Sequence, residues 1–319
     1  MRLPHPFIRL PFTFDPGRLA TELDSVADSA WMAHPSGLAG NSAVALISYQ
    51  GSDNDEFSGR MMETPHLAAL PYHRQVMASF DEVLSRSRLM RLAGNSEVSN
   101  HVDFNYHWYS RLRIHIPIVT NPDVVFHCGD EAIHMQPGEC WIFDSWRWHK
   151  VVNSSQMDRT HLVIDLSGSS RFWGMVTEAS AGTLSTAAMT YDPASDPSLR
   201  LERFNIAPVM APGELEAIAR EIIRDFKACA DNPATLVEQY EKLLLDLGRD
   251  WREIWYEYGQ GPAGWPRYQA LLNRTQQKLH PERRALVTAS NNVGVNPIIV
   301  QRLLRVALAN QHFEDFTGI

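Results

Sequence analysis

Hydrophobic and polar residues alternate along the middle of the chain. In the segment 111–119, Leu112, Ile114, Ile116 and Ile118 fall on one face of an extended strand, and more polar residues fall on the other. Short strands of this kind, separated by Gly, Asn, Asp and Pro, predict an antiparallel sandwich or barrel rather than alternating βαβ units. The predicted strands are 88–93, 111–119, 124–128, 131–136, 140–144, 149–153 and 159–166.

Helical periodicity flanks this β region on both sides. On the N-terminal side we expect a helix at 15–26, a strand at 42–50 and a second helix at 71–87. The small, polar segment 179–198 is typical of a linker or a surface excursion. The expected helices beyond it are 212–230, 236–248, 267–279 and 297–311. We therefore predict two domains, a β domain with N-terminal helices at 1–178 and a helical domain at 200–319.

The composition is that of an ordinary globular protein. Hydrophobic residues make up 44% of the 319 residues, and the formal net charge is −8. An acidic chain argues against nucleic-acid binding, which normally needs a basic face. Cys128, Cys140 and Cys229 are too few for a disulfide framework, so we expect reduced thiols. Since no apolar run approaches the ~20 residues of a membrane span, we expect a cytoplasmic protein without a membrane partner.

One set of ligand-type residues stands out in the β region. His101 and Asp103 have the spacing of two ligands in a facial triad of two histidines and one carboxylate, which binds ferrous iron. The motif alone is weak, because a solvated turn histidine beside an acid gives the same pattern, and 280–282 and 312–314 repeat it in helical sequence. The ordered addition of His149 and Arg159 on later strands is harder to explain by chance. We predict that His101, Asp103 and His149 bind iron.

The polar face of 111–119 has two readings. It is either the water-facing side of an ordinary sheet or the lining of a barrel that holds an anion. In the second reading, Arg159 binds the far carboxylate of a dicarboxylic cosubstrate, because such an anion in a pocket of low dielectric needs cationic partners. Arg113 and His115 are then additional donors. The pattern leaves both readings open.

Four motifs resemble the aspartyl/asparaginyl β-hydroxylase family of iron(II)- and 2-oxoglutarate-dependent oxygenases. They are H-x-D at 101–103, R-L-R-x-H at 111–115, F-D-x-x-x-x-H at 143–149 and R-x-H-L-V-x-D at 159–165. The H-x-D form and the "HLVIDLSG" ending resemble bacterial members that act on free amino acids, such as the proline cis-4-hydroxylases. The resemblance implies a jelly-roll, cupin-like double-stranded β-helix, with His101, Asp103 and His149 as iron ligands and Arg159 as the 2-oxoglutarate ligand. Arg113 and His115 fall on family positions that contact cosubstrate or substrate.

The predicted function is therefore that of an iron(II)- and 2-oxoglutarate-dependent dioxygenase. It would hydroxylate an unactivated C–H bond of a free amino acid or a small amino-acid-derived metabolite, using Fe²⁺, 2-oxoglutarate and O₂, with ascorbate as a candidate supporting reductant. Asp103 favours hydroxylation over halogenation, since halide-transferring relatives leave that position vacant. Two alternatives stay open: a β-hydroxylase of Asp or Asn side chains in a peptide or protein, and a non-catalytic cupin-like metal-binding or sensor protein. A homodimer also stays open.

Overall fold

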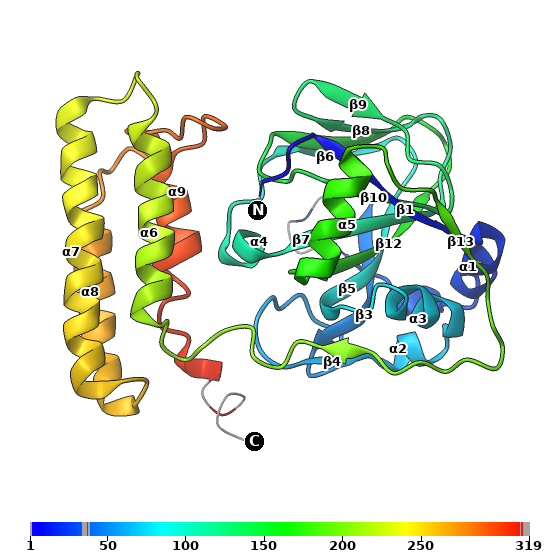
Figure 1. The fold of residues 1–319 in the computed structure, drawn as a ribbon, viewed down its shortest axis with the longest axis horizontal. Helices are drawn as coiled ribbons and strands as arrows, with labels where there is room; N and C mark the ends of the chain where they lie inside the picture. The colour runs from blue at the N-terminus through cyan, green and yellow to red at the C-terminus, as the bar shows by residue number, and fades with distance from the viewer. Residues whose placement is uncertain (1, 34–36, 38, 313, 315–319) are drawn as a thin grey trace. The chain divides into compact units, whose positions relative to one another are not determined.

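The computed structural model describes residues 2–33, 37, 39–312 and 314, and its contacts divide the chain into two compact units (Figure 1). The first unit holds the residues up to Asp103 together with Ser110–Arg203. The second holds Phe104–Tyr109 together with the described residues from Phe204 onward. This division differs from the expected one in assigning the short segment 104–109 to the helical unit. We keep 1–178 and 200–319 as a proposal for the two domains.

Two sheets whose central strands are antiparallel form the centre of the first unit. The larger sheet contains, in spatial order, β5 (Val83–Leu92), β12 (Arg159–Leu166), β7 (Leu112–Val119) and β10 (Glu139–Phe143). The smaller sheet contains, in spatial order, β6 (Ser96–His101), β11 (His149–Asn153), β8 (Val124–Cys128) and β9 (Glu131–Ile133). The chain therefore passes back and forth between the sheets as it runs from β5 to β12. This order defines a double-stranded β-helix of the jelly-roll type, and the predicted fold class is confirmed.

Further strands widen the larger sheet at both edges. Beyond β10 lie β1 (Phe7–Phe14) and then β13 (Ala187–Met189) at the edge. Those on the β5 side are β3 (Asn41–Tyr49), β2 (Met32–Ala33), β4 (Met61–Glu63) and β14 (Arg200–Leu201). Pro11 lies where the β1–β10 register is interrupted between Arg9 and Thr13, a place where a ladder hydrogen bond is not needed. That interruption explains how a segment broken by prolines still forms a strand.

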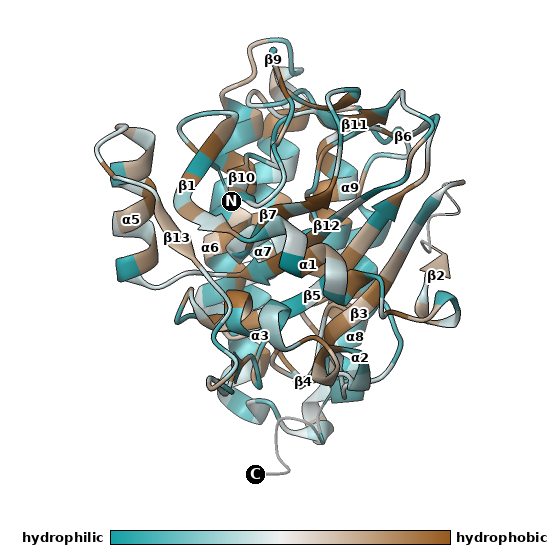
Figure 2. Ribbon diagram, turned by 90° about the vertical axis from the view of Figure 1, so that its right-hand side faces the viewer, coloured by the Kyte–Doolittle hydropathy of each residue, from teal (hydrophilic) through white to brown (hydrophobic). Residues whose placement is uncertain are grey.

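One face of the larger sheet forms the main hydrophobic core. Ile114, Ile116, Leu162 and Ile164 are fully buried there, and Figure 2 shows hydrophobic stretches along β3 and β7. Burying such a side chain stabilises a fold by roughly 1.5–3 kcal/mol. The same core includes residues of the short helices α1 (Pro16–Leu23), α2 (Pro65–Ala68), α3 (Pro71–Ala78) and α5 (Ser170–Ser180). These helices keep water from that face of the sheet.

The opposite face of the larger sheet lines the inside of the barrel. Register pairs Val163 with Arg88 on one side and His115 on the other, so these three side chains share one face. His115 and Arg159 on this face are 6% and 4% exposed. The structure therefore rules out a water-facing sheet for the 111–119 strand, because its polar face is buried inside the barrel, and the bound anion stays a prediction.

Helices form the second unit. The α-helices are α6 (Pro212–Lys227), α7 (Ala234–Tyr258), α8 (Trp265–Gln277) and α9 (Val295–Ile299), and all of α4 (Tyr106–Ser110) except Ser110 also belongs to this unit. Leu215, Ile218, Ile222 and Phe226 of α6 are all buried, as a single apolar stripe requires. In the described part of the chain, no helix is long and apolar enough to cross a membrane.

Several expected boundaries were wrong, including the following four. The helix expected at 71–87 ends at Ala78, because Asp81 has a φ of 50° that breaks the helix and β5 begins at Val83. The helix expected at 297–311 is short, since regular α geometry ends at Ile299 and a π-helical segment, 300–304, follows. α7 runs well past the expected end at 248. The strand expected at 131–136 ends at Ile133.

Candidate metal centre

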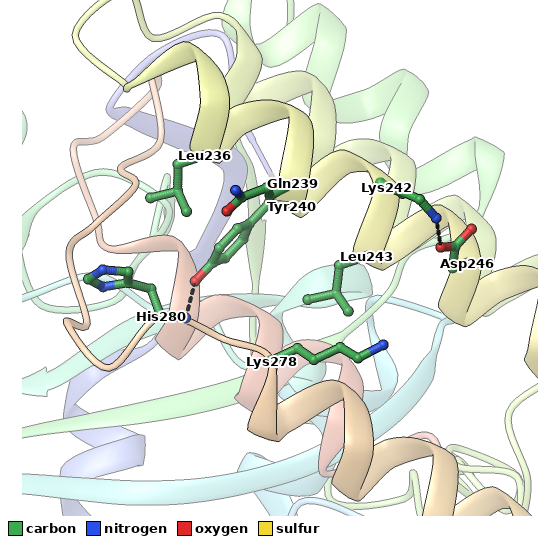
Figure 3. Close-up of a pocket in the computed structure, with 8 residues that line it drawn as sticks. All are labelled: Leu236, Gln239, Tyr240, Lys242, Leu243, Asp246, Lys278 and His280. Carbon is green, nitrogen blue, oxygen red and sulfur yellow. Dashed lines mark hydrogen bonds and ion pairs between the residues drawn. The ribbon is translucent and has the colours of Figure 1, made fainter.

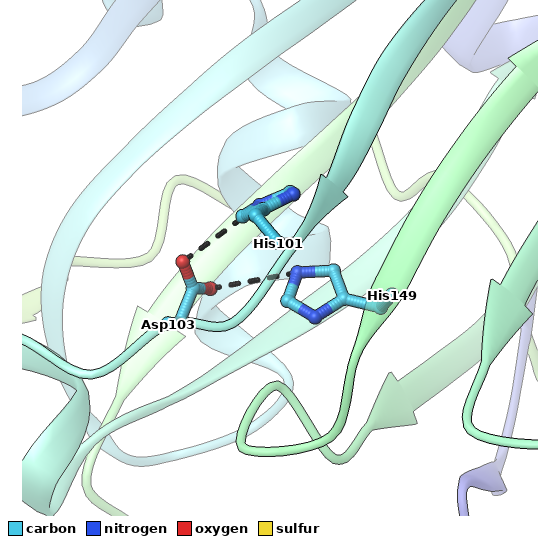
Figure 4. Close-up of side chains that lie close together, drawn as sticks. All are labelled: His101, Asp103 and His149. Carbon is cyan, nitrogen blue, oxygen red and sulfur yellow. Dashed lines mark ion pairs between the residues drawn. The ribbon is translucent and has the colours of Figure 1, made fainter. Parts of the chain in front are cut away.

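The three predicted ligands meet at one end of the smaller sheet (Figure 4). His101 is the last residue of β6 and His149 is the first residue of β11, and the two are direct antiparallel partners. Their imidazole rings therefore lie side by side, with centroids 4.2 Å apart. Asp103 follows two residues after His101 and points toward both rings. Register between two strands distant in sequence brings this set together.

The distances fit a site for one metal ion. Asp103 Oδ1 lies 3.9 Å from His101 Nε2, and Asp103 Oδ2 lies 3.9 Å from His149 Nε2. One donor atom from each residue lies within 4.8 Å of the others. The 3.9 Å separations are too long for hydrogen bonds. The three ligand atoms therefore face one another without bonding to each other. Two imidazole nitrogens and a carboxylate are the donor set that non-haem Fe²⁺ takes in a facial triad.

Backbone carbonyls fix both imidazoles in the ligating form. His101 Nδ1 donates to the Ser99 carbonyl at 2.7 Å, and His149 Nδ1 donates to the Arg147 carbonyl at 2.9 Å. Because a carbonyl can only accept, each Nδ1 carries the proton and each Nε2 presents its lone pair toward Asp103. Burial lowers the pKa of His149, and this effect outweighs the opposing charge of Asp103. A neutral imidazole is the form that binds a metal.

The turn before His149 also positions Asp103. Asp144 accepts hydrogen bonds from the Trp146 N–H and from Arg147 Nε, both at 3.1 Å. The carbonyl of Ser145, inside this turn, accepts from the Asp103 N–H at 2.9 Å. Asp144 therefore caps the turn that holds both the Asp103 backbone and the Arg147 carbonyl bonded to His149. Its effect on the ligands passes through the backbone.

Arg159 lies inside the barrel without an acidic partner. Among the residues that the structure describes, no carboxylate forms an ion pair with it, and its Nε has no hydrogen-bond partner. Its guanidinium carbon lies 4.9 Å from the centroid of the Phe126 ring. Burial alone lowers its pKa to about 9. A buried cation of this kind is costly unless an anion pairs with it, so the site suits a carboxylate ligand.

Arg113 and His115 differ in whether their side chains already have an acidic or hydrogen-bond partner in the protein. Arg113 already forms a two-pronged pair with Asp165, with Nε–Oδ1 at 2.6 Å and Nη2–Oδ2 at 2.8 Å. Burial acts to lower the pKa of Arg113, but Asp165 more than offsets it and the pKa is raised. Neither ring nitrogen of His115 has a hydrogen-bond partner among the described residues. Burial first, and then the charges of Arg113 and Arg159, hold its pKa well below the usual value, so the ring is neutral.

His161 belongs to the same group of inward-facing residues, although sequence reasoning did not include it. It is fully buried, its ring stacks on Phe126 at 5.3 Å, and it lies 5.8 Å from the His115 ring. Its position two residues after Arg159 on a strand puts both side chains on one face. This two-residue spacing from Arg159 could have predicted from the sequence that His161 faces the same site. The inner wall around Arg159 therefore carries two neutral imidazoles.

The second unit carries a separate surface pocket of about 340 Å³ on α7 (Figure 3). Its polar groups mostly bind one another: Lys242 pairs with Asp246, and the Tyr240 hydroxyl accepts from the His280 N–H and donates to Asn296. Within the described residues this pocket brings together no metal-ligating set, so it does not compete with the triad as a candidate centre.

A double-stranded β-helix with two histidines and an aspartate facing one another is the arrangement of the cupin-type class, and its three donors fit a facial metal triad. The sequence comparisons narrow this class. Residues 43–168 match the family model described as aspartyl/asparaginyl β-hydroxylase. Residues 43–168 are therefore similar to that family, whose members are iron(II)- and 2-oxoglutarate-dependent hydroxylases, and the predicted resemblance is confirmed.

A curated relative is the L-proline cis-3-hydroxylase 1 of a Streptomyces species. It is 30% identical over 110 residues, which are 33% of this chain and 37% of the relative. The chain therefore spans little more than a third of that relative's length. The relative's name specifies a cis-3-hydroxylase, whereas the motifs resembled the cis-4-hydroxylases.

Solved structures with partial similarity include two oxygenase-related proteins. One is a 2OG-Fe(II) oxygenase family oxidoreductase from Burkholderia pseudomallei, 12% identical over 48% of this chain and 78% of its own, with a TM-score of 0.34. The other is the non-heme alpha ketoglutarate dependent epimerase SnoN from nogalamycin biosynthesis, 13% identical over 50% and 77%, with a TM-score of 0.35. TM-scores this low are no evidence for the fold, which rests on the order of the strands in the two sheets.

Proposed function

We propose that this protein is an iron(II)- and 2-oxoglutarate-dependent dioxygenase that hydroxylates an unactivated C–H bond of a free amino acid or a small derivative. The observation that carries the proposal is the pairing of two sites in one barrel. His101, Asp103 and His149 offer a facial donor set, and Arg159 offers a buried cation without an acid. Iron bound at the triad, together with 2-oxoglutarate and O₂, would supply the oxidation of the C–H bond.

Each residue has a defined part in this proposal. The triad holds the ion, and the carbonyls of Ser99 and Arg147 keep both imidazoles in the ligating tautomer. Arg159 pairs with the far carboxylate of 2-oxoglutarate, and this charge-assisted pair offsets the cost of burying both groups. His115, which is neutral, donates one hydrogen bond to an oxygen of the cosubstrate. Arg113 acts mainly as a positioning residue, because Asp165 already compensates its charge.

A small free amino acid is the substrate class that the curated relative supports, since that protein is named a hydroxylase of L-proline. The family description supports the alternative, an Asp or Asn side chain in a peptide. Free amino acids and peptides that contain Asp or Asn should therefore be tested as substrates in parallel. A cupin-like sensor without turnover is the third outcome.

The test is succinate release from 2-oxoglutarate by the full chain with Fe²⁺ and ascorbate, in the presence of an amino-acid pool. We expect succinate and a product whose mass is higher by one oxygen atom. The Asp103→Ala variant should lose both, and Arg159→Gln should raise the KM for 2-oxoglutarate at least about 10-fold. His280→Ala, which alters the chance copy of the motif in the helical unit, is the matched control and should change neither. Absence of turnover with every free acid and peptide would contradict the proposal.

A further inference from the structure

A second group of buried charges lies at the other end of the inner face. Arg86 and Arg88 of β5 are each 3% exposed. Arg88 shares a face with Val163 and His115 by register, and Arg86 Nε lies 4.0 Å from the Asp165 carboxylate of β12. Both guanidiniums therefore point into the barrel. The proposed chemistry above uses neither of them.

The acids of this group do not match its cations. Asp165 is bonded through both oxygens to Arg113, and its 4.0 Å distance from Arg86 is too long for a hydrogen bond. The other carboxylate is Asp55, whose Oδ1 accepts from Arg88 Nη1 at 2.8 Å and lies 4.0 Å from Arg86. Among the described residues, Nε of Arg86 and Nε of Arg88 have no hydrogen-bond partner. Among the described residues, three arginines (86, 88 and 113) therefore share two carboxylates (Asp55 and Asp165). One positive charge of the group is left uncompensated.

Asp55 reaches the arginines from a surface loop. Residues 50–60, which we call the Asp55 loop, connect β3 to β4, and Asp55 is 30% exposed. Its backbone carbonyl accepts from Arg86 Nη1 at 3.0 Å, and the Phe57 ring centroid lies 3.7 Å from the Arg86 guanidinium carbon. The ends of the loop are joined by a bond from the Gln50 N–H to the Arg60 carbonyl at 2.9 Å. A loop residue, and not a barrel residue, therefore supplies the carboxylate.

The group is distinct from the site around Arg159. Arg159 and Asp165 lie six residues apart on β12, which is about 20 Å along a strand. His115 lies between them and feels the charges of Arg113, Arg159 and the ligand His149. Register places Arg88 beside Val163, four residues or about 13 Å along the strand from Arg159, and Arg86 lies further from Arg159 still. A single small dianion at Arg159 does not account for both.

We propose that Arg86 and Arg88 bind a carboxylate of the substrate, and that the Asp55 carboxylate occupies this place until the substrate displaces it. The inference deepens the hydroxylase function proposed above and rests on it. It commits the substrate to a small molecule with a free carboxylate. A carboxamide of the same shape carries no charge and leaves the guanidiniums uncompensated in a buried site, so it binds poorly.

The first experiment compares each free amino acid that supports succinate release with its carboxamide. We expect the carboxamide to lower kcat/KM by about 10- to 100-fold. Equal values for acid and amide would overturn the carboxylate site while leaving the hydroxylase function intact. Failure of every compound to release succinate would instead contradict the proposed function, and the next measurement then decides the inference without turnover.

That measurement is hydrogen exchange of the Asp55 loop in the full chain, with acetate as a carboxylate probe and acetamide as its neutral match. Acetate should speed exchange in residues 50–60 by displacing Asp55, and acetamide should not. The Arg88→Gln variant should lose the response to acetate. Equal responses to both probes, or no response to acetate at high concentration, would overturn the inference.

Two variants and one control complete the test. Asp55→Asn keeps the shape of the side chain but removes the competing charge, so the KM for the free acid should fall by about 10-fold. Arg88→Gln should raise that KM and leave the KM for 2-oxoglutarate unchanged, unlike Arg159→Gln. Asp53→Asn, on the same loop but facing His66 at 3.1 Å, is the matched control. A higher KM in Asp55→Asn would show that Asp55 helps binding, and would refute its role as a competitor.

Discussion

Replacing Arg159 by methionine should stabilise the ligand-free protein. The guanidinium is 4% exposed, has no acidic partner among the described residues, and packs near Phe126. Methionine fills a similar volume without a charge and makes favourable contacts with aromatic rings. The substitution therefore removes a desolvated cation while keeping most of the packing.

The size of the effect follows from the pKa of Arg159. Burial lowers this pKa from the usual range of an arginine to about 9, and a pKa difference of one corresponds to about 1.4 kcal/mol, so the cost of the buried charge is at most on the order of 5 kcal/mol. Replacements of buried ions by apolar residues stabilise proteins by about 1–4 kcal/mol. In a unit of this size, each kcal/mol raises Tm by about 2–4 °C.

The pH dependence has a definite sign. Because the folded pKa lies below the unfolded one, the destabilisation is fully present below the folded pKa of about 9 and fades as the pH rises from there toward the unfolded pKa. The gain in Tm from Arg159→Met should therefore be the same at all pH values from about 6 to about 8. A gain that changes across this range would point to a different group.

Thermal unfolding is the assay, with and without 2-oxoglutarate and Mn²⁺ in place of iron. Without ligand, Arg159→Met should have a Tm at least about 3 °C above the parent. With ligand at about 100 times its Kd, the parent should gain about 2.7 kcal/mol and the variant far less. Arg9→Met, which removes an exposed cation paired with Glu139, is the control and should shift Tm little. A lower Tm for the ligand-free variant would refute the reasoning.

Three further predictions follow from the same contacts. Asp165→Asn leaves Arg113 without its two-pronged partner, so the free energy of unfolding should fall by about 3–5 kcal/mol in chemical denaturation. Treatment with a chelator should abolish succinate release, and Fe²⁺ should restore it while Zn²⁺, which has no redox chemistry, should not. Asp144→Ala should weaken metal binding by about 10- to 100-fold in calorimetry, because the turn that holds the Arg147 carbonyl loses its cap.

The alternation of apolar residues predicted the central strands well. β12 begins and ends at the expected residues, 159 and 166, because Leu162, Ile164 and Leu166 alternate along it and polar turns flank it. β6 was missed for the opposite reason. Its sequence SEVSNH is polar and partly or fully exposed along its length, so it lacks the hydrophobic periodicity that predicts a strand. Its pairing with β11 holds it in place.

The candidate site shows the same limit at the level of side chains. The order of His101, Asp103, His149 and Arg159 within the predicted β region was enough to predict a cluster, because a rolled sheet brings such positions together. The partner of Arg113 was not predictable, since it depends on the register that places Asp165 beside it across 52 residues of chain. The Asp55 loop was equally hidden, because an acidic residue in a polar loop looks like any solvated one.

The assignment of 104–109 to the helical unit affects how the protein can be made and divided. This segment is held there by contacts far along the chain, including Arg302 Nε donating to the Phe104 carbonyl at 3.1 Å and the Tyr106 hydroxyl donating to Glu214. During synthesis these six residues leave the ribosome long before their partners exist. A fragment that ends at residue 203 would contain 104–109 without the helices that they contact, directly after Asp103. A fragment that starts at 204 would lack a piece of its own core. Any chimera that exchanges the helices must carry 104–109 along with them.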